Sequence, residues 1–257
     1  MGLAVITGAS SGLGYQFARL AAEDGHDLVI CADEEEIHAA AEKLRRLGAK
    51  VEATVEDLAT EQGFDAFWSR IEGQDIDLLF ANAGRALGHG FVEQDPMAIR
   101  RLINLNVMQT TMLLRMAGEK MRTRGSGRIL VTGSIGGFVP GPFDAVYNAT
   151  KAYLNMLCGG LADEWKESSV TITCLMPGPT DTAIFHREEN RLEEAPISDS
   201  ETKDDPVEVA KAGYAAMLRG DREAIPGARS KLITALSGVV PSPLLARFHR
   251  WGAEPRD

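Results

Sequence analysis

Runs of mainly apolar residues alternate with segments of helical periodicity along most of the chain. The apolar runs occupy residues 3–6, 27–31, 51–55, 76–80, 128–132 and 170–176. Apolar residues recur every three or four positions in residues 12–23, 34–47, 60–71, 96–121, 145–167 and 206–218. The runs predict strands, and the periodic segments predict amphipathic helices. This alternation predicts an α/β fold, a doubly wound parallel sheet with helices on both faces.

The organisation of the chain predicts a single domain. Residues 1–257 contain no internal repeat and no low-complexity linker. The last part, residues 227–257, mixes Gly, Pro and Leu and is interpreted as a C-terminal extension. The ligand crevice of a doubly wound sheet lies at the carboxyl ends of its strands. We therefore expect the functional residues in the turns that follow the predicted strands.

Composition narrows the possible partners and the compartment. A net charge of −10 argues against a broad nucleic-acid surface or an anionic membrane as partner. The first residues predict no N-terminal leader, and the sequence has no apolar stretch of transmembrane length and no metal-ligand spacing around the 3 cysteines. We expect a cytoplasmic protein with buried free thiols, no metal, no nucleic-acid partner and no integral membrane segment.

A glycine-rich segment joins the first predicted strand to the first predicted helix. Residues 7–14 are Thr-Gly-Ala-Ser-Ser-Gly-Leu-Gly. Glycine permits a sharp turn and lets a pyrophosphate approach the backbone. The N-terminus of the helix adds free N–H groups and a partial positive charge. The segment therefore predicts a site for the phosphates of a dinucleotide.

Tyr147 and Lys151 are four residues apart in a predicted helix. Residues at this spacing share one face of a helix, one turn apart. A fixed ammonium beside a phenol favours the tyrosinate and predicts that the pKa of Tyr147 falls from about 10. A tyrosine with a lowered pKa is suited to donate and accept a proton in catalysis.

Further motifs follow in an order that resembles a known family. The sequence Asn-Ala-Gly ends the fourth run at residues 82–84, and Asn106 lies in the next predicted helix. Ser134 follows the fifth run, thirteen residues before Tyr147, and Pro177-Gly178 ends the sixth. Together with the glycine-rich turn, these motifs resemble the short-chain dehydrogenase/reductase family over residues 2–182. The resemblance implies a Rossmann-type domain and hydride transfer between a nicotinamide and a ketone or secondary alcohol.

The resemblance also implies a role for each catalytic candidate. Tyr147 would be the acid/base, and Lys151 would lower its pKa and hold the ribose hydroxyls. Ser134 would orient the substrate oxygen, and Asn106 would anchor a water that joins Lys151 to solvent. Each residue alone has a structural explanation: Tyr147 could pack on the sheet, Lys151 could be a solvated charge, Ser134 could form a turn, and Asn106 could be a satisfied core group. Their joint occurrence favours catalysis.

A larger set of residues would contact the cofactor if the resemblance holds. These residues lie in the glycine-rich turn, after the second, third and fourth runs, in the catalytic pair and after the sixth run: Gly8, Ser10, Ser11, Gly12, Leu13, Gly14, Asp33, Asp57, Leu58, Asn82, Ala83, Gly84, Tyr147, Lys151, Pro177, Gly178, Thr180 and Thr182. Thr180 departs from the apolar residue usual in the family, although a backbone contact would survive the change.

The end of the second predicted strand selects between NAD and NADP. An acidic side chain there accepts hydrogen bonds from the ribose 2′-hydroxyl and repels a 2′-phosphate. Counted from Gly14, the NAD-selecting aspartate of the family falls on Ala32, and its NADP-selecting arginine falls on Asp33. The acidic run at residues 33–36 nevertheless favours NAD, and NADP remains open.

The remaining expectations concern substrate and assembly. Residues 183–205 fall where the family carries its substrate lid. The apolar residues between 232 and 251 predict an amphipathic helix pair over the cleft or against a neighbour, or, less favoured, against a membrane surface. By analogy with the family, residues 96–121 and 145–167 predict a homodimer or homotetramer. A non-catalytic, cofactor-binding sensor or scaffold is the alternative to an enzyme.

Overall fold

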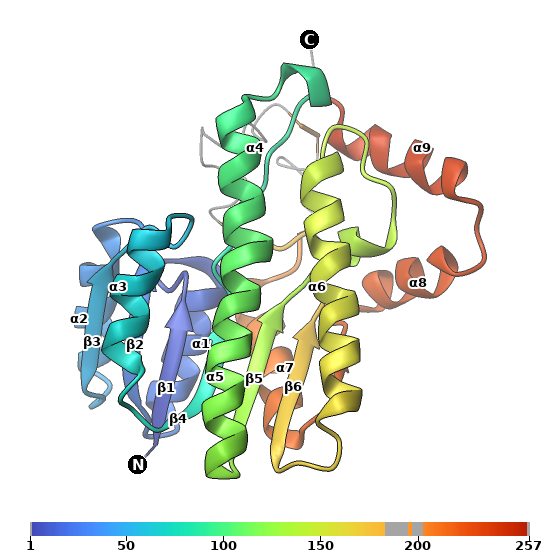
Figure 1. Ribbon diagram of the computed structural model, residues 1–257. Helices are drawn as coiled ribbons and strands as arrows, with labels where there is room; N and C mark the ends of the chain where they lie inside the picture. The colour runs from blue at the N-terminus through green and yellow to red at the C-terminus, as the bar shows by residue number, and fades with distance from the viewer. Residues whose placement is uncertain (1, 183–194, 197–202, 256–257) are drawn as a thin grey trace.

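A parallel sheet forms the centre of the protein (Figure 1). The computed structural model describes residues 2–182, 195–196 and 203–255. The sheet has seven strands in the order β3-β2-β1-β4-β5-β6-β7, and every pairing is parallel. The strands are β1 (Leu3–Thr7), β2 (Asp27–Ala32), β3 (Val51–Val55), β4 (Ile76–Ala81), β5 (Gly127–Thr132), β6 (Val170–Leu175) and β7 (Glu223–Ala224). The strand order reverses between β1 and β4, so the predicted doubly wound sheet is confirmed.

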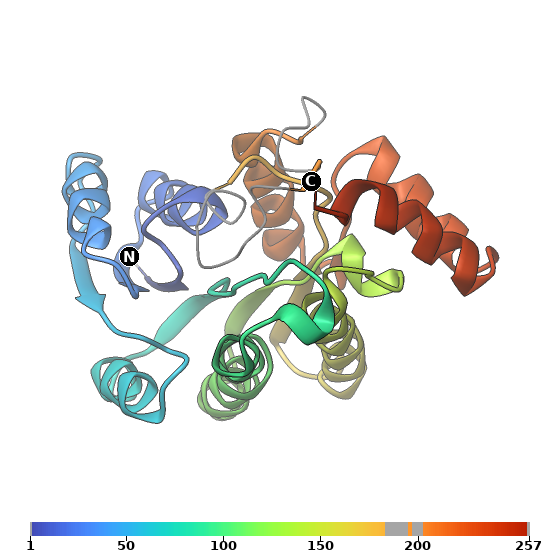
Figure 2. The same ribbon diagram turned by 90° about the horizontal axis from the view of Figure 1, so that it is seen from above.

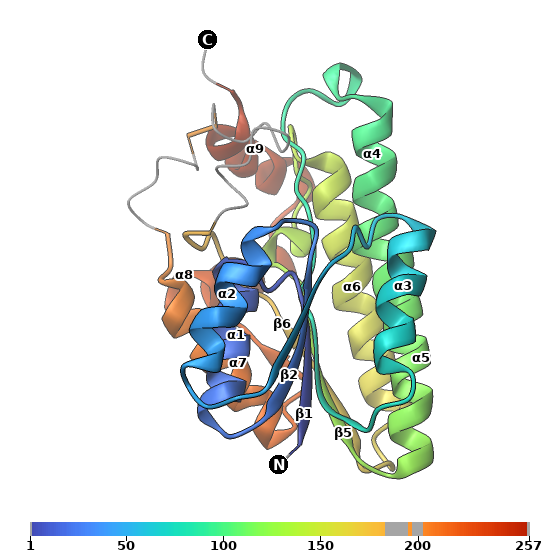
Figure 3. The same cartoon turned by 90° about the vertical axis from the view of Figure 1, so that its left-hand side faces the viewer.

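Helices cover both faces of this sheet (Figure 3). One face carries α1 (Gly12–Glu23), α2 (Glu36–Arg45) and α7 (Pro206–Arg219). The other carries α3 (Glu61–Ile71), α5 (Thr110–Arg124) and α6 (Ala145–Glu164). Each helix presents an apolar stripe to strands that are buried on both sides, which is why the strands appear as apolar runs.

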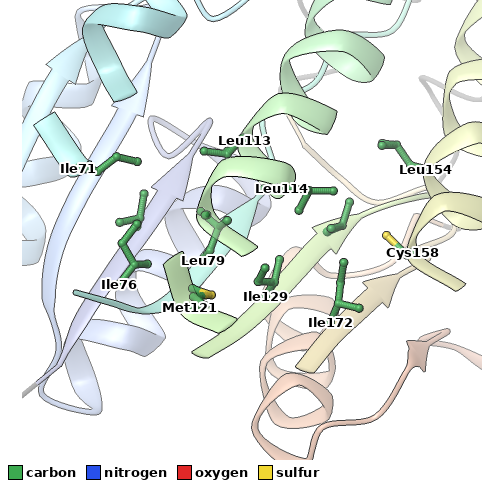
Figure 4. Packing of buried hydrophobic residues seen from close by; sticks show 14 of the residues in the cluster. Ile71, Ile76, Leu79, Leu113, Leu114, Met121, Ile129, Leu154, Cys158 and Ile172 are labelled. Atoms are coloured by element: carbon green, nitrogen blue, oxygen red, sulfur yellow. The ribbon is translucent and has the colours of Figure 1, made fainter. Parts of the chain in front are cut away.

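The packing under α5 and α6 makes the floor of the site rigid. Leu114 on α5 and Leu154 on α6 belong to the same buried cluster as Ile129 on β5 (Figure 4), and all three are at most 3% exposed. Burying a side chain of this size contributes roughly 1.5–3 kcal/mol to stability. The cluster fixes α6 against the sheet, and α6 carries the predicted catalytic pair.

The long helix predicted over residues 96–121 is interrupted. It consists of α4 (Pro96–Ile103), a π-helical segment η2 (Asn104–Gln109) and α5. Hydroxyls support the wider turn, since Thr110 Oγ1 donates to the Leu105 carbonyl at 2.9 Å. A π-turn inserts extra chain without breaking the helical course, so the apolar period along the sequence does not reveal it.

The C-terminal part forms two helices beyond the carboxyl ends of the strands (Figures 1 and 2). These helices are α8 (Ala228–Ser237) and α9 (Ser242–Ala253), so the predicted helix pair is present. Of the predicted lid, only residues 195–196 and 203–205 lie within the described residues. Short 3₁₀ turns, η1 (Phe91–Glu93) and η3 (Ile135–Phe138), complete the rim. In the described ranges, no helix has the length and apolar character needed to cross a membrane.

Candidate active site

A cavity of about 890 Å³ opens at the carboxyl ends of the central strands. It runs from the glycine-rich turn after β1 to Tyr147 on α6, and α8 and α9 line its outer wall. All of the predicted site residues line this cavity except Gly14 and Asn106, which lie directly behind its wall. Residues from seven separate segments of the sequence therefore meet at one edge of the sheet.

The glycine-rich turn has the shape that a pyrophosphate needs. Gly8 and Gly12 have φ of 67° and 54°, values that favour glycine. A Cβ on Gly14 would lie 2.0 Å from the Gly8 carbonyl oxygen, so only glycine lets α1 begin this close to the turn. Ser11 precedes α1 and makes no side-chain capping bond, which leaves first-turn N–H groups for an anion. The residues present therefore fit a dinucleotide.

Asn82 ties three strands together under the turn. Its Nδ2 donates to the carbonyl oxygens of Thr7 at 3.1 Å and Gly8 at 3.2 Å. Its Oδ1 accepts a hydrogen bond from the Thr132 hydroxyl at 2.9 Å. The side chain thus fixes the ends of β1, β4 and β5 in register, beside the backbone that faces the cavity.

Ion pairs occupy the end of the cavity next to β2 and β3. Asp33 pairs with Arg85 at 2.5 Å, and these side chains are 23% and 12% exposed. Asp57 pairs with Arg101 at 2.9 Å and accepts a hydrogen bond from the Ala59 N–H at 3.0 Å. The sequence interpretation missed Arg85, although it directly follows the Asn-Ala-Gly motif. Asp33, the first residue of the acidic run after β2, is therefore paired with the guanidinium of Arg85. The prediction of NAD from the sequence did not include this positive charge.

Ser134, Tyr147 and Lys151 meet at the other end. Lys151 Nζ lies 5.7 Å from the centre of the Tyr147 ring and donates to the Thr132 carbonyl at 2.7 Å. The Ser134 hydroxyl accepts a hydrogen bond from Gly136 N–H at 3.0 Å. Asn155 holds the Ser134 backbone through a 2.9 Å bond from its Nδ2 to the Ser134 carbonyl.

The prediction that Lys151 gives Tyr147 a lowered pKa is wrong for this chain. Burial raises the pKa of Tyr147 to about 12, the hydrogen bond with Ser134 lowers it, and the charge of Asp144 raises it. Burial also lowers the pKa of Lys151 to about 8. Removal from water penalises the tyrosinate more than an ammonium at this distance favours it, so desolvation decides the direction.

Asn106 lies in the π-helical segment, 1% exposed, with its amide fully engaged. Its Oδ1 accepts from Arg85 N–H at 2.9 Å, and its Nδ2 donates to the Arg85 carbonyl at 2.9 Å and the Thr150 hydroxyl at 3.0 Å. A Cβ on Gly84 would lie 3.3 Å from Asn106 Oδ1 and 3.6 Å from Lys151 Nζ. Asn106 thus positions the chain beside Lys151.

The segment after β6 closes the cavity next to the glycine-rich turn. Thr180 forms a bridge with Asp204, and its hydroxyl donates to the Gly178 carbonyl at 3.0 Å. A Cβ on Gly12 would lie 3.2 Å from the Thr182 side chain, so Thr182 covers the turn. Within the described part of the chain, no group of three or more metal-ligating side chains is placed to hold a metal ion.

Comparison with known proteins gives the following matches. The chain matches the sequence profile described as short chain dehydrogenase over residues 2–193. It is 31% identical to 17-beta-hydroxysteroid dehydrogenase type 1 of Homo sapiens over 190 residues, 71% of this chain and 58% of that protein. It therefore spans less than two thirds of that relative.

Two solved structures are similar over nearly the whole chain. A short-chain dehydrogenase from Sphingobium yanoikuyae, in complex with NADPH, has a TM-score of 0.84 and 32% identity, with 93% of each chain covered. The bulky-bulky ketone specific alcohol dehydrogenase from Comamonas testosteroni has a TM-score of 0.77 and 27% identity, again with 93% of each covered.

Proposed function

Because the chain belongs to the short-chain dehydrogenase family, we propose that it is an oxidoreductase acting on a ketone or secondary alcohol with a nicotinamide cofactor. The observation that carries this proposal is a single cavity with a phosphate-binding turn at one end and Ser134, Tyr147 and Lys151 at the other. The similar short-chain dehydrogenase that was solved in complex with NADPH supports a nicotinamide cofactor. When bound, the nicotinamide supplies or accepts the hydride.

The side chains of this chain handle the proton and the orientation of the substrate. Tyr147 donates a proton to the substrate oxygen in reduction, and Ser134 holds that oxygen by a hydrogen bond. The pKa of Tyr147, raised by burial to about 12, keeps the phenol protonated at neutral pH. Lys151 holds the ribose hydroxyls, and Asn106 fixes the backbone beside it.

The substrate is a bulky, mainly apolar ketone. The outer wall of the cavity is formed by apolar side chains of α8, α9 and the turn between them: Ile233, Leu236, Val240, Leu245 and Phe248. Such a wall favours a ligand with a large apolar surface. The relatives named for a hydroxysteroid and for bulky ketones support the same class.

NAD is favoured over NADP as the cofactor, and Arg85 makes the difference between the two affinities smaller. The Asp33 carboxylate repels a 2′-phosphate and accepts hydrogen bonds from a 2′-hydroxyl. Arg85 offsets part of that repulsion, because it pairs with Asp33 at 2.5 Å. Calorimetric titration with NADH and NADPH tests this point, and Arg85→Met should weaken NADPH more than NADH. NADPH binding about tenfold tighter than NADH to the wild type would refute the preference.

Turnover tests the enzymatic role. A panel of bulky ketones is incubated with NADH or NADPH, and cofactor oxidation is followed by absorbance. Tyr147→Phe keeps the ring and removes the proton, so it should lower kcat by roughly 10²–10⁴-fold while leaving NADH affinity unchanged. If no ketone gives turnover above the Tyr147→Phe variant while NADH still binds, the non-catalytic sensor or scaffold becomes the better explanation.

A further inference from the structure

A buried carboxyl lies beside the proposed catalytic tyrosine. Asp144 precedes α6, three residues before Tyr147, and lines the same cavity. It is 9% exposed and makes no side-chain capping bond to α6. Its Oδ2 lies 3.7 Å from His249 Nε2. Its Oδ1 is buried and finds no hydrogen-bond partner among the described residues.

His249 comes from α9 and lies against the same short segment, beside which α9 passes in Figures 1 and 2. Asn148 Nδ2 donates to the Val139 carbonyl at 3.2 Å and lies 3.3 Å from His249 Nε2. His249 Nε2 therefore has two polar neighbours, the Asn148 amide at 3.3 Å and the Asp144 carboxyl at 3.7 Å, and only the first is within hydrogen-bond distance. Burial lowers the pKa of His249, which favours its neutral state. His249 therefore lies beside Asp144 without satisfying its carboxyl.

No cation of the described chain that lies near this segment is directed at Asp144. Arg250, the neighbour of His249, stacks on the Phe143 ring at 5.2 Å and pairs with Glu254 at 3.1 Å. Lys151 donates to the Thr132 carbonyl instead. Burial raises the pKa of Asp144 to about 7. Near neutral pH the carboxyl can thus both donate and accept a hydrogen bond, as a hydroxyl partner requires.

Asp144 is a carboxyl in a cavity that is lined largely by apolar side chains. The neighbouring cavity wall is apolar, with Val139, Val240, Leu245 and Phe248. A buried carboxyl with an unsatisfied oxygen is costly to keep, and Asp144 lines the cavity with the remaining 12% of its side chain exposed, so a polar group of the ligand suits this carboxyl as a partner. We propose that Asp144 binds a hydroxyl group of the substrate at a point separate from the carbonyl that Tyr147 addresses.

This proposal rests on the proposed function and narrows its substrate class to bulky apolar ketones that carry a hydroxyl group. Asp144 immediately precedes α6 and Tyr147 lies in its first turn, and both residues line the cavity. The hydroxyl therefore lies several bonds away from the reacting carbonyl. In the reverse direction the corresponding substrate is a diol.

The test compares ketones that differ only in a hydroxyl group. Benzylacetone and its meta- and para-hydroxyl derivatives are titrated by calorimetry into enzyme saturated with NAD⁺, which cannot reduce a ketone. We expect the better hydroxyl derivative to bind about tenfold more tightly than benzylacetone. Asp144→Leu should abolish this preference and leave the affinity for benzylacetone unchanged or improved. Asp144→Asn, which keeps a donor and an acceptor, should retain part of it.

Two results would overturn the proposal. One is equal affinity of benzylacetone and both hydroxyl derivatives for the wild type, and the other is a preference that survives Asp144→Leu. Asp163→Asn, on the exposed far end of the same helix, is the matched control and should preserve the preference. Failure here is distinguishable from failure of the proposed function, because binding to the NAD⁺ complex requires no turnover, whereas that function is judged by ketone-dependent NADH oxidation.

Discussion

Replacement of Asn82 by alanine tests whether this side chain holds the carboxyl edge of the sheet together. The change removes three hydrogen bonds, to the Thr7 carbonyl at 3.1 Å, the Gly8 carbonyl at 3.2 Å and the Thr132 hydroxyl at 2.9 Å. A typical intramolecular hydrogen bond contributes about 1 kcal/mol net. We therefore expect Asn82→Ala to lower the free energy of unfolding by about 3 kcal/mol.

A double-mutant cycle with Thr132 isolates one of these bonds. Thr132→Val removes only the bond to Asn82 Oδ1 and should cost about 1 kcal/mol. Because this bond is shared, the double variant should lose about 3 kcal/mol rather than 4, a coupling energy of about 1 kcal/mol. Urea unfolding measures all four proteins, with an unchanged m-value showing that the unfolding reaction is the same.

Two outcomes would refute this reasoning. A loss below about 1 kcal/mol for Asn82→Ala would mean that its hydrogen bonds are replaced by water without cost. Strictly additive losses would mean that Asn82 and Thr132 do not interact. NADH affinity should fall in parallel, because Asn82 also orients the Gly8 carbonyl at the cavity wall.

Three further perturbations test other parts of the molecule. Gly14→Ala places a methyl group 2.0 Å from the Gly8 carbonyl oxygen, so calorimetry should show loss of NADH binding, whereas Gly159→Ala, which meets no atom within 4 Å, should preserve it. Asp144→Asn removes a carboxyl whose pKa is raised from 3.8 to about 7. Its stabilising contribution is complete below about pH 4 and is lost as the pH rises through about 7, so the variant should melt above the wild type at pH 8 but not at pH 4. An equal shift at both pH values would contradict this assignment. Met156 is 70% exposed and Tyr153 39% exposed on α6, so Met156→Glu should shift a homodimer or homotetramer toward monomer in light scattering, and a monomeric wild type would end the oligomer prediction.

The sequence predicts six of the seven strands, because the central strands are buried on both faces, whereas the short edge strand β7, with Glu223 exposed, has no apolar run and was missed. Strands buried on both faces need contiguous apolar residues, and these are visible without any knowledge of their neighbours. The π-helical segment at Asn104–Gln109 is different, since its wider turn depends on side-chain bonds such as that of Thr110. Helix ends also shift, as at α2, where the predicted residues 34–47 become Glu36–Arg45.

Some parts of the candidate site can likewise be predicted from local motifs, and others depend on contacts between residues that are far apart in the sequence. The glycine-rich turn and the Tyr147–Lys151 pair are local motifs, and the spacing along the chain is enough to propose them. The pair of Asp33 with Arg85 joins residues 52 apart, and the contact of Asn148 with His249 joins residues 101 apart. Neither contact has a local pattern. The direction of the Tyr147 pKa shift also needs the fold, because burial, rather than the neighbouring charge, decides it.

The ionisable side chains at the two ends of the cavity differ: those at the cofactor end form ion pairs, and those at the catalytic end are buried. At the cofactor end, Asp33 and Asp57 are held in ion pairs with arginines. At the catalytic end, burial brings the pKa of Asp144 to about 7 and that of Lys151 to about 8. Groups with such values exchange protons near neutral pH at little cost in free energy. The ion-paired carboxylates are thus separated from the end of the cavity where Tyr147 handles the proton, and burial distinguishes that end.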